Sequence, residues 1–331
     1  MSTFHAVITS IQSPTDCVRQ LAAAVNDAGG TVIVAGDKKS PEHYDAMYCS
    51  YMSVDRQNSS GFTLSQHLPY NHYARKNIAY LQAMREGALC IYETDDDNKP
   101  MPTWSLRAER LTARDLTTSS GWVNAYQHFG GGRIWPRGFP LDQVHHQAPP
   151  VLGNRFVEGV IQQGLVDNAP DVDAVWRLVN LPTDWVFSRA SPLWLGPGSW
   201  CPFNSQNTWW RPLAYPLMYL PSTCSSRLTD IWRSFVAQRC LWALDRGIVF
   251  FAPDAVQDRN PHNLLHDFAD EVSGYLHSAH IAQKLSRLDL QDGLEGVKLN
   301  MERCYEALVG AAVLTHEELP RVRAWLHDLP V

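Results

Sequence analysis

Hydrophobic and polar positions in the first forty residues alternate in blocks that predict a strand, a helix and a second strand. The run 4–11 is short, apolar and rich in β-formers, which is typical of a buried strand. Helix-start residues follow, with Ser13 as the expected cap and Pro14 in the first turn, and Gly29-Gly30 ends the helix. Residues 31–35 predict the second strand. Because such a unit requires parallel strands joined by a right-handed crossover, the first half of the chain is predicted to be α/β.

A further buried strand is predicted at 89–92, and it stops at three consecutive carboxylates, Asp95, Asp96 and Asp97. A helix predicted over 69–87 leads into it. Ligands of open α/β sheets bind where strands leave the core, and oxygen-rich clusters suit the hard cations Mg²⁺ and Mn²⁺. In an extended backbone Asp95 and Asp97 point to one side and Asp96 to the other. The alternative is a solvated acidic turn, since charge runs commonly face water.

The rest of the chain is predicted to alternate long loops with helices and strands. Residues 99–170 carry many Gly, Pro and aromatic residues, as functional loops in α/β domains do. Helices are predicted from about Asp171 and over 228–244, with a strand at 247–251 between the latter and a final helical stretch. From about residue 262 onward the periodicity is helical. The chain is therefore predicted to end in a helical appendage.

Composition and charge exclude several classes of protein. A hydrophobic content of 45% and a charged content of 19% describe an ordinary globular chain. The net charge of −6 argues against nucleic acid as a partner, because phosphate binding needs a basic surface. No stretch approaches the roughly 20 apolar residues of a membrane span, so we expect no membrane span and a cytoplasmic protein. Seven cysteines without a C-x-x-C pair indicate reduced thiols rather than disulfides or a zinc site.

Longer strings of residues make a family resemblance specific. The strings are Leu68-Pro69-Tyr70, Ala74-Arg75-Lys76-Asn77, Glu93 to Asp97, Cys201 to Asn207, Ser226 to Arg233 and Gln257 to Leu264. They resemble the STELLO family of glycosyltransferase-like proteins. A more distant resemblance is to the reversibly glycosylated polypeptides, the UDP-arabinopyranose mutases, through Asp95 to Asp97, Arg137 to Pro140 and Asp171 to Asp173. Together the matches span about residues 5–275 and leave the C-terminal helices uncovered.

This resemblance implies a GT-A-like, Rossmann-type fold of nucleotide-diphospho-sugar transferases, with a mostly parallel central sheet and a C-terminal helical extension. It implies a catalytic domain over 1–275, made of a nucleotide-binding half (1–100) and an acceptor half (101–275). The extension would cover 276–331. Its helices are candidates for contacts in a homo-oligomer, although helical tails more commonly pack against their own domain.

The resemblance also implies roles for side chains around a nucleotide and a metal ion. Mn²⁺ or Mg²⁺ would be held by Asp95, Asp97 and His262. The diphosphate would contact Arg75 and Lys76, two residues that viewed alone are also compatible with solvated helix charges. Asp96 would lie near the ribose. The strand ends bordering the base would be Thr9-Ser10 and Gly36-Asp37.

On the acceptor side the resemblance implies one catalytic carboxylate and a polar pocket. Asp230, in the first turn of a predicted helix, is the candidate general base toward an acceptor hydroxyl. The residues shaping the acceptor or sugar pocket would be Arg137, Asp171, Asp173 and Asn204. The amides around Asn204 either bind hydroxyls or satisfy backbone groups in a turn.

The function expected from these residues is metal-dependent transfer of a sugar from a nucleoside-diphosphate sugar, with a UDP-sugar as the expected donor. The sequence does not identify the acceptor. Two alternatives stay open: a UDP-sugar mutase of the arabinopyranose type, and a non-catalytic GT-A-like regulator of glycan synthesis. Phe139 stands where the mutases have Tyr, and no counterpart of the membrane anchor of plant STELLO proteins is recognised.

Overall fold

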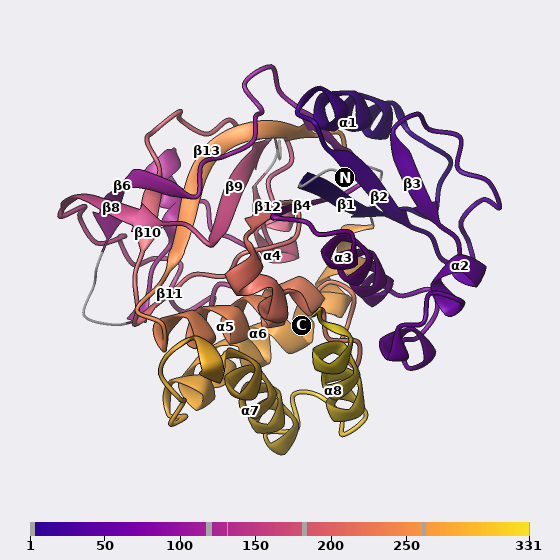
Figure 1. Ribbon diagram of the computed structural model, residues 1–331. Helices are drawn as coiled ribbons and strands as arrows, with labels where there is room; N and C mark the ends of the chain where they lie inside the picture. Colours follow the sequence, from indigo (N-terminus) through magenta and orange to yellow (C-terminus); the bar gives the residue numbers. More distant parts are fainter. Residues whose placement is uncertain (1–3, 117–120, 131, 181–183, 260–262, 331) are drawn as a thin grey trace.

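The computed structural model describes residues 4–116, 121–130, 132–180, 184–259 and 263–330. These residues form a large mixed sheet flanked by helices (Figure 1). The strands are, in chain order, β1 (Phe4–Thr9), β2 (Thr31–Ala35), β3 (Cys49–Met52), β4 (Cys90–Thr94), β5 (Asn98–Pro100), β6 (Arg110–Leu116), β7 (Gly121–Trp122), β8 (Gly153–Glu158), β9 (Ile161–Asp167), β10 (Leu193–Leu195), β11 (Ser199–Trp200), β12 (Asn207–Trp210) and β13 (Ile248–Gln257). Strands β7 and β11 pair with each other outside the main sheet.

The main sheet has the order β3-β2-β1-β4-β12-β9-β13-β10-β6-β8, with β5 paired to β13. Its first four strands are all parallel. Strand β12 is antiparallel to both β4 and β9, and β9 is parallel to β13. Strands β1, β2, β4, β9 and β13 therefore run in one direction, and their carboxyl ends share one edge of the sheet. The predicted α/β fold is confirmed, and this arrangement is consistent with the GT-A-like fold.

The predicted strand–helix–strand unit is present as β1, α1 (Asp16–Asp27) and β2. The expected cap was wrong: the Thr15 side chain, not that of Ser13, accepts a hydrogen bond from Val18 N at 3.2 Å. Thr15 is the last residue with extended dihedrals before the helix, whereas Ser13 lies two residues too early to reach the free N–H groups. Gly29 follows the helix at φ +78°, a conformation that favours glycine.

The other helices are α2 (Val54–Asn58), α3 (Lys76–Arg85), α4 (Ala174–Val179), α5 (Thr229–Trp242), α6 (Leu264–Ser286), α7 (Val297–Gly310) and α8 (Glu318–Asp328). Five 3-10 turns are η1 (Thr63–Gln66), η2 (Tyr73–Arg75), η3 (Ala125–Phe129), η4 (Pro212–Met218) and η5 (Leu294–Gly296). The helix expected over 69–87 is thus shorter, because its first residues form a loop and a 3-10 turn. The strand expected at 247–251 is longer and ends at Gln257.

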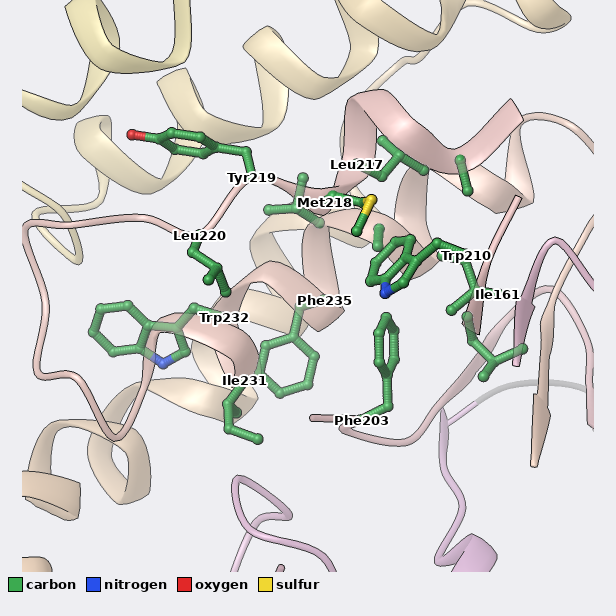
Figure 2. Packing of buried hydrophobic residues seen from close by; sticks show 14 of the residues in the cluster. Ile161, Phe203, Trp210, Leu217, Met218, Tyr219, Leu220, Ile231, Trp232 and Phe235 are labelled. Atoms are coloured by element: carbon green, nitrogen blue, oxygen red, sulfur yellow. The ribbon is translucent and has the colours of Figure 1, made fainter. Parts of the chain in front are cut away.

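Both faces of the central strands β1, β4, β9 and β12 are covered and these strands are almost entirely buried, whereas the edge strand β8 is largely exposed. Alternate residues of β1 divide between two cores: Phe4 and Ile8 pack with α1, whereas Val7 belongs to the larger core on the other face. That larger core contains α3 and α5 and many of the aromatic residues. Figure 2 shows part of it, where Phe203 lies against Trp210 with ring centroids 5.9 Å apart.

A buried ion pair joins the sheet to helix α5 inside this core. Glu93 on β4 and Arg233 on α5 are both fully buried, with Arg233 Nη1 donating to Glu93 Oε1 at 2.8 Å. Trp210 Nε1 donates to the other carboxylate oxygen at 2.8 Å, and the Tyr80 hydroxyl also donates to Glu93. Burial alone would lower the pKa of Arg233, but Glu93 raises it above its ordinary value. Arg233 is therefore charged at neutral pH.

The C-terminal helices pack on the same core rather than standing apart. Tyr305 of α7 and Trp325 of α8 are buried in it, and Trp325 Nε1 donates to Pro216 O at 2.8 Å. Asp328 accepts a hydrogen bond from Leu64 N at 2.8 Å, which ties α8 to the first hundred residues. The expected domain boundary at 275/276 falls inside α6, and the division into domains stays a prediction. In the described part of the chain, no helix combines the length and the apolar character needed to cross a bilayer.

We predict that Glu93→Gln destabilises the protein strongly, because it leaves the fully buried Arg233 without a counter-charge. The expected loss in the free energy of unfolding is about 3–5 kcal/mol, measured by urea denaturation. Glu306→Gln is the matched control, since Glu306 is 47% exposed and lies 3.5 Å from Arg323 on the surface. The control is expected to unfold like the wild type. Equal stability of Glu93→Gln and the wild type would contradict the prediction.

Candidate functional site

A cleft of about 460 Å³ opens at the edge of the sheet where the parallel strands end. It is lined by residues that follow β1, β2, β4 and β13. The residues predicted from the sequence that line it are Thr9, Ser10, Gly36, Asp37, Arg75, Asp95, Asp96 and Asp97. The structure therefore brings most of the predicted nucleotide and metal residues together in one place. His262 lies outside the described residues.

The three aspartates occupy a turn between β4 and β5, where Asn98 N donates back to Asp95 O at 3.3 Å. The extended backbone expected for them is therefore wrong. Each carboxylate is held by a donor from a different part of the chain. Asp95 accepts from the Tyr73 hydroxyl at 2.6 Å, Asp96 from the Ser10 hydroxyl at 2.6 Å, and Asp97 from Gln257 Nε2 at 2.9 Å.

This turn is rich in negative charge that its neighbours neutralise only in part. Burial, then Asp95 and Asp96, raise the pKa of Asp97 to about 7. Among the described residues, the buried Oδ1 of Asp97 has no hydrogen-bond partner. Oxygen ligands of this kind suit Mg²⁺ or Mn²⁺, and a divalent cation would relieve the repulsion between the carboxylates. The residues present fit such an ion.

The described residues do not by themselves supply a complete metal site. Within those ranges, no group of three or more His, Cys, Asp or Glu side chains is arranged to hold a metal ion. Magnesium commonly takes one or two carboxylates and completes its shell with water and substrate phosphates. The arrangement is thus suited to an ion that arrives with a phosphorylated ligand.

Of the two cations predicted to contact the diphosphate, Arg75 and Lys76, the structure places only Arg75 in the cleft. Lys76 is fully buried, and its Nζ donates to Tyr73 Oη at 2.7 Å, Thr94 O at 2.5 Å and Asp95 Oδ1 at 3.1 Å. It lies behind Asp95 and does not line the cleft, because a buried ammonium needs a carboxylate and carbonyl partners. Arg75 does line the cleft.

Most of the hydrogen-bond donors of the Arg75 guanidinium are paired with other groups of the protein. Its Nε donates to Gln57 Oε1 at 2.9 Å and its Nη1 donates to the Ser65 and Leu68 carbonyls. Burial lowers the pKa of Arg75. Nη2 has no hydrogen-bond partner within the part of the chain that the structure describes. That N–H pair is itself buried, since Arg75 is 1% exposed, so Arg75 presents little of its guanidinium to the cleft that it lines.

Asp230 does not line the cleft but is linked to it by hydrogen bonds. Ser205 N donates to Asp230 Oδ2 at 3.1 Å, and the Ser205 hydroxyl lies 2.6 Å from the Tyr73 hydroxyl, which holds Asp95. Arg137 binds both oxygens of Asp230 at 3.1 and 3.0 Å. Burial would raise the pKa of Asp230, but Arg137 lowers it below its ordinary value. The candidate base is therefore a firmly held, weakly basic carboxylate.

The predicted acceptor-pocket residues are buried and engaged with other protein groups. Arg137 forms a bidentate pair with Asp171, with both contacts at 2.8 Å. Asp173 caps α4 by accepting from Trp176 N at 2.7 Å, and its other oxygen accepts from Trp135 Nε1 at 2.6 Å. Asn204 accepts from Gln163 and Gln206 N, which matches the structural alternative for this amide. None of the four lines the cleft.

Sequence reasoning missed several residues that do line the cleft: Lys39, His72, Tyr73, Arg227, Gln257 and Arg259. Gln257 and Arg259 were missed because the last sheet strand was expected to stop at 251. Its continuation to Gln257 brings both residues to the edge where β4 ends. The stretch 252–257 reads Ala-Pro-Asp-Ala-Val-Gln and contains a single β-branched residue, Val256, so the local pattern gave little signal for this continuation.

The sequence is similar to known proteins over most of its length. A family model described as STELLO glycosyltransferases matches residues 227–331. The match includes the C-terminal helices, which the motif comparison had left uncovered. "Probable glycosyltransferase STELLO1" of Arabidopsis thaliana is 30% identical over 75% of this chain and 34% of its own length.

"Probable glycosyltransferase STELLO2" of the same plant is 26% identical over 98% of this chain and 44% of its own length. The chain thus spans less than half the length of these curated relatives. The resemblance expected from the motifs is confirmed. This chain is similar to proteins described as STELLO glycosyltransferases.

Proposed function

We propose that this protein is a metal-dependent glycosyltransferase that takes its sugar from a nucleoside-diphosphate sugar, with UDP-sugars as the first donors to test. The observation that supports the proposal most is the acidic turn 95–97 in the cleft. Its three carboxylates meet at the carboxyl end of a buried parallel strand, beside the ends of β1 and β2. Open α/β sheets bind nucleotides at such an edge.

The roles proposed for the cleft residues follow the order of the strands. The ends of β1 and β2, with Thr9 and Asp37, would border the base, and Asp96 would meet the ribose beside Ser10. Asp95 and Asp97 would hold Mn²⁺ or Mg²⁺, with His262 proposed as a further ligand. When bound, the ion stabilises the negative charge that develops on the departing diphosphate.

The reaction proposed is a substitution at the anomeric carbon of the sugar. The bond from that carbon to the diphosphate oxygen breaks, and its electron pair leaves with the nucleoside diphosphate. An acceptor oxygen forms the new bond and releases its proton. Donors fixed in advance around the developing charge are worth several kcal/mol in such sites. Arg75 is proposed as one such donor because it lines the cleft.

For Asp230 we propose a positioning role rather than that of the base. A general base works best with a pKa near the working pH and an oxygen open to the acceptor. Arg137 holds the pKa of Asp230 low and Ser205 and Arg137 occupy its oxygens. Through Ser205 and Tyr73, Asp230 instead fixes the orientation of Asp95.

We predict that Asp97→Asn weakens metal-dependent binding of UDP by at least about tenfold, because ligand oxygens for a divalent cation must be strong acceptors. Isothermal titration calorimetry with UDP, with and without Mn²⁺, measures this, and release of free sugar from UDP-sugars measures the chemistry. Removal of the metal with EDTA is expected to have the same effect on the wild type.

Asp258→Asn is the control for this variant, since Asp258 is an exposed carboxylate beside the cleft that does not line it. Asp97→Asn is expected to melt at or above the wild-type temperature without metal, because the amide removes repulsion from Asp95 and Asp96. Equal UDP binding by the wild type with and without Mn²⁺ would contradict the proposed metal dependence. Absence of nucleotide binding would favour the non-catalytic regulator.

We predict that Tyr73→Phe impairs metal-dependent UDP binding while the protein stays folded. Burial, then Asp95, raise the pKa of Tyr73 well above its ordinary value, so its hydroxyl is a hydrogen-bond donor at neutral pH. Loss of that hydroxyl leaves Asp95 with the Lys76 contact but without the Tyr73 donor, and costs about 1–2 kcal/mol of stability. Tyr70→Phe is the control, because the Tyr70 hydroxyl bonds only the half-buried Asn58 at 3.1–3.3 Å among described residues. Equal UDP binding by both variants would remove Tyr73 from the site.

A further inference from the structure

The cleft carries its surplus of positive charge at one end. The sheet order β2-β1-β4-β12-β9-β13 places the ends of β2 and β1 on one side of the acidic turn and the end of β13 on the other. Arg259 follows β13, and Arg227 precedes α5; both line the cleft. If the base lies toward β1 and β2 and the diphosphate at the acidic turn, the transferred sugar reaches this arginine end.

Carboxylates at the arginine end match only part of its positive charge. Arg177 stands behind the two lining arginines, and it pairs with Asp267 at 3.1 Å and with Glu271 at 3.5 Å. Arg227 also pairs with Glu271, its Nε donating at 3.0 Å. Asp267 and Glu271 therefore pair with Arg177 and Arg227. Arg259 is the third arginine at this end of the cleft.

Arg259 contacts a neutral side chain instead of a carboxylate among the described residues. Its Nε donates to Gln257 Oε1 at 3.1 Å, and the same Gln257 amide donates to Asp97. Its Nη1 is buried without a hydrogen-bond partner in the described ranges. Burial, then Arg177 and Arg227, lower the pKa of Arg259 to about 10. A half-buried guanidinium held in this way is short of an anion.

We propose that Arg259, supported by Arg227, binds a carboxylate on the transferred sugar, so that the preferred donor is a nucleoside-diphosphate uronic acid. The inference rests on the proposed function, because the position of the sugar follows from a diphosphate at the acidic turn. A guanidinium donates strong, charge-assisted hydrogen bonds to a carboxylate, whereas it gains little from a neutral hydroxymethyl group. The site discriminates between sugars by this charge.

The test compares UDP, UDP-glucose and UDP-glucuronic acid by calorimetry on the full chain with Mn²⁺. The two sugars differ only at C6, as hydroxymethyl or carboxylate. The wild type is expected to bind UDP-glucuronic acid about tenfold or more tightly than UDP-glucose, since hydrogen bonds to a charged group reach that range. Arg259→Gln is expected to reduce this preference to about twofold or less without changing UDP binding, and Arg259→Lys to retain part of it.

Lys39→Gln is the matched control, because Lys39 lines the same cleft beyond the end of β2. It is expected to weaken all three ligands by a similar factor. Equal binding of the two sugars by the wild type overturns the inference and leaves the proposed function intact. So does an Arg259→Gln variant that loses UDP itself, since Arg259 would then act on the diphosphate, either directly or through Gln257 and Asp97. Failure of UDP to bind overturns both.

A carboxylate belonging to the acceptor is distinguished by a separate titration. Free glucuronate is added to protein already saturated with UDP and Mn²⁺. Binding that depends on Arg259, combined with equal affinity for the two UDP-sugars, would assign the carboxylate to the acceptor and overturn the assignment to the donor. Absence of such binding, with a clear preference for UDP-glucuronic acid, supports the assignment to the donor.

Discussion

Buried guanidinium groups join the sheet of this protein to helix α5. Arg233 reaches from α5 to Glu93 on β4, and Arg137 lies between Asp171 and Asp230. Removing such charges from water costs several kcal/mol for each ion, and only close, fully hydrogen-bonded partners offset that cost. The pairs are therefore stable only when strand, loop and helix are all in place. They fix the position of α5 relative to the strand ends that form the cleft.

The acidic turn gathers like charges, in contrast to the paired opposite charges around α5. Three adjacent carboxylates repel one another, and this turn is also half-buried. Burial and the neighbouring charges together raise the pKa of Asp97 to about 7. The turn is kept by Tyr73, Ser10 and Gln257, which arrive from three separate segments. Hydrogen-bond donors from three segments thus hold one unfavourable cluster in place. The proposed binding of a cation by this cluster explains why. Destabilising features of this kind concentrate at functional sites.

Sequence reasoning succeeded where local pattern and tertiary structure agree. The strand–helix–strand unit, the helix near 229–242 and the acidic strand end are set by periodicity and by turn residues, and they were predicted. The partners of the buried charges were not, since Arg137 and Asp230 are separated by 93 residues in the sequence. Ser13 was preferred to Thr15 as a cap because both residues have the right chemistry and only the backbone dihedrals decide between them.

The cations show most clearly why sequence proximity misleads in such a cleft. Lys76 lies one element before the acidic turn, and its charge is used inside the protein because a buried ammonium must find its counter-charge nearby. The cations that reach the far end of the cleft, Arg227 and Arg259, come from segments more than a hundred residues later. Both line the cleft, whereas Lys76 does not. The position of a cation in the folded chain, rather than its distance in sequence from the acidic turn, therefore decides whether it lines the cleft.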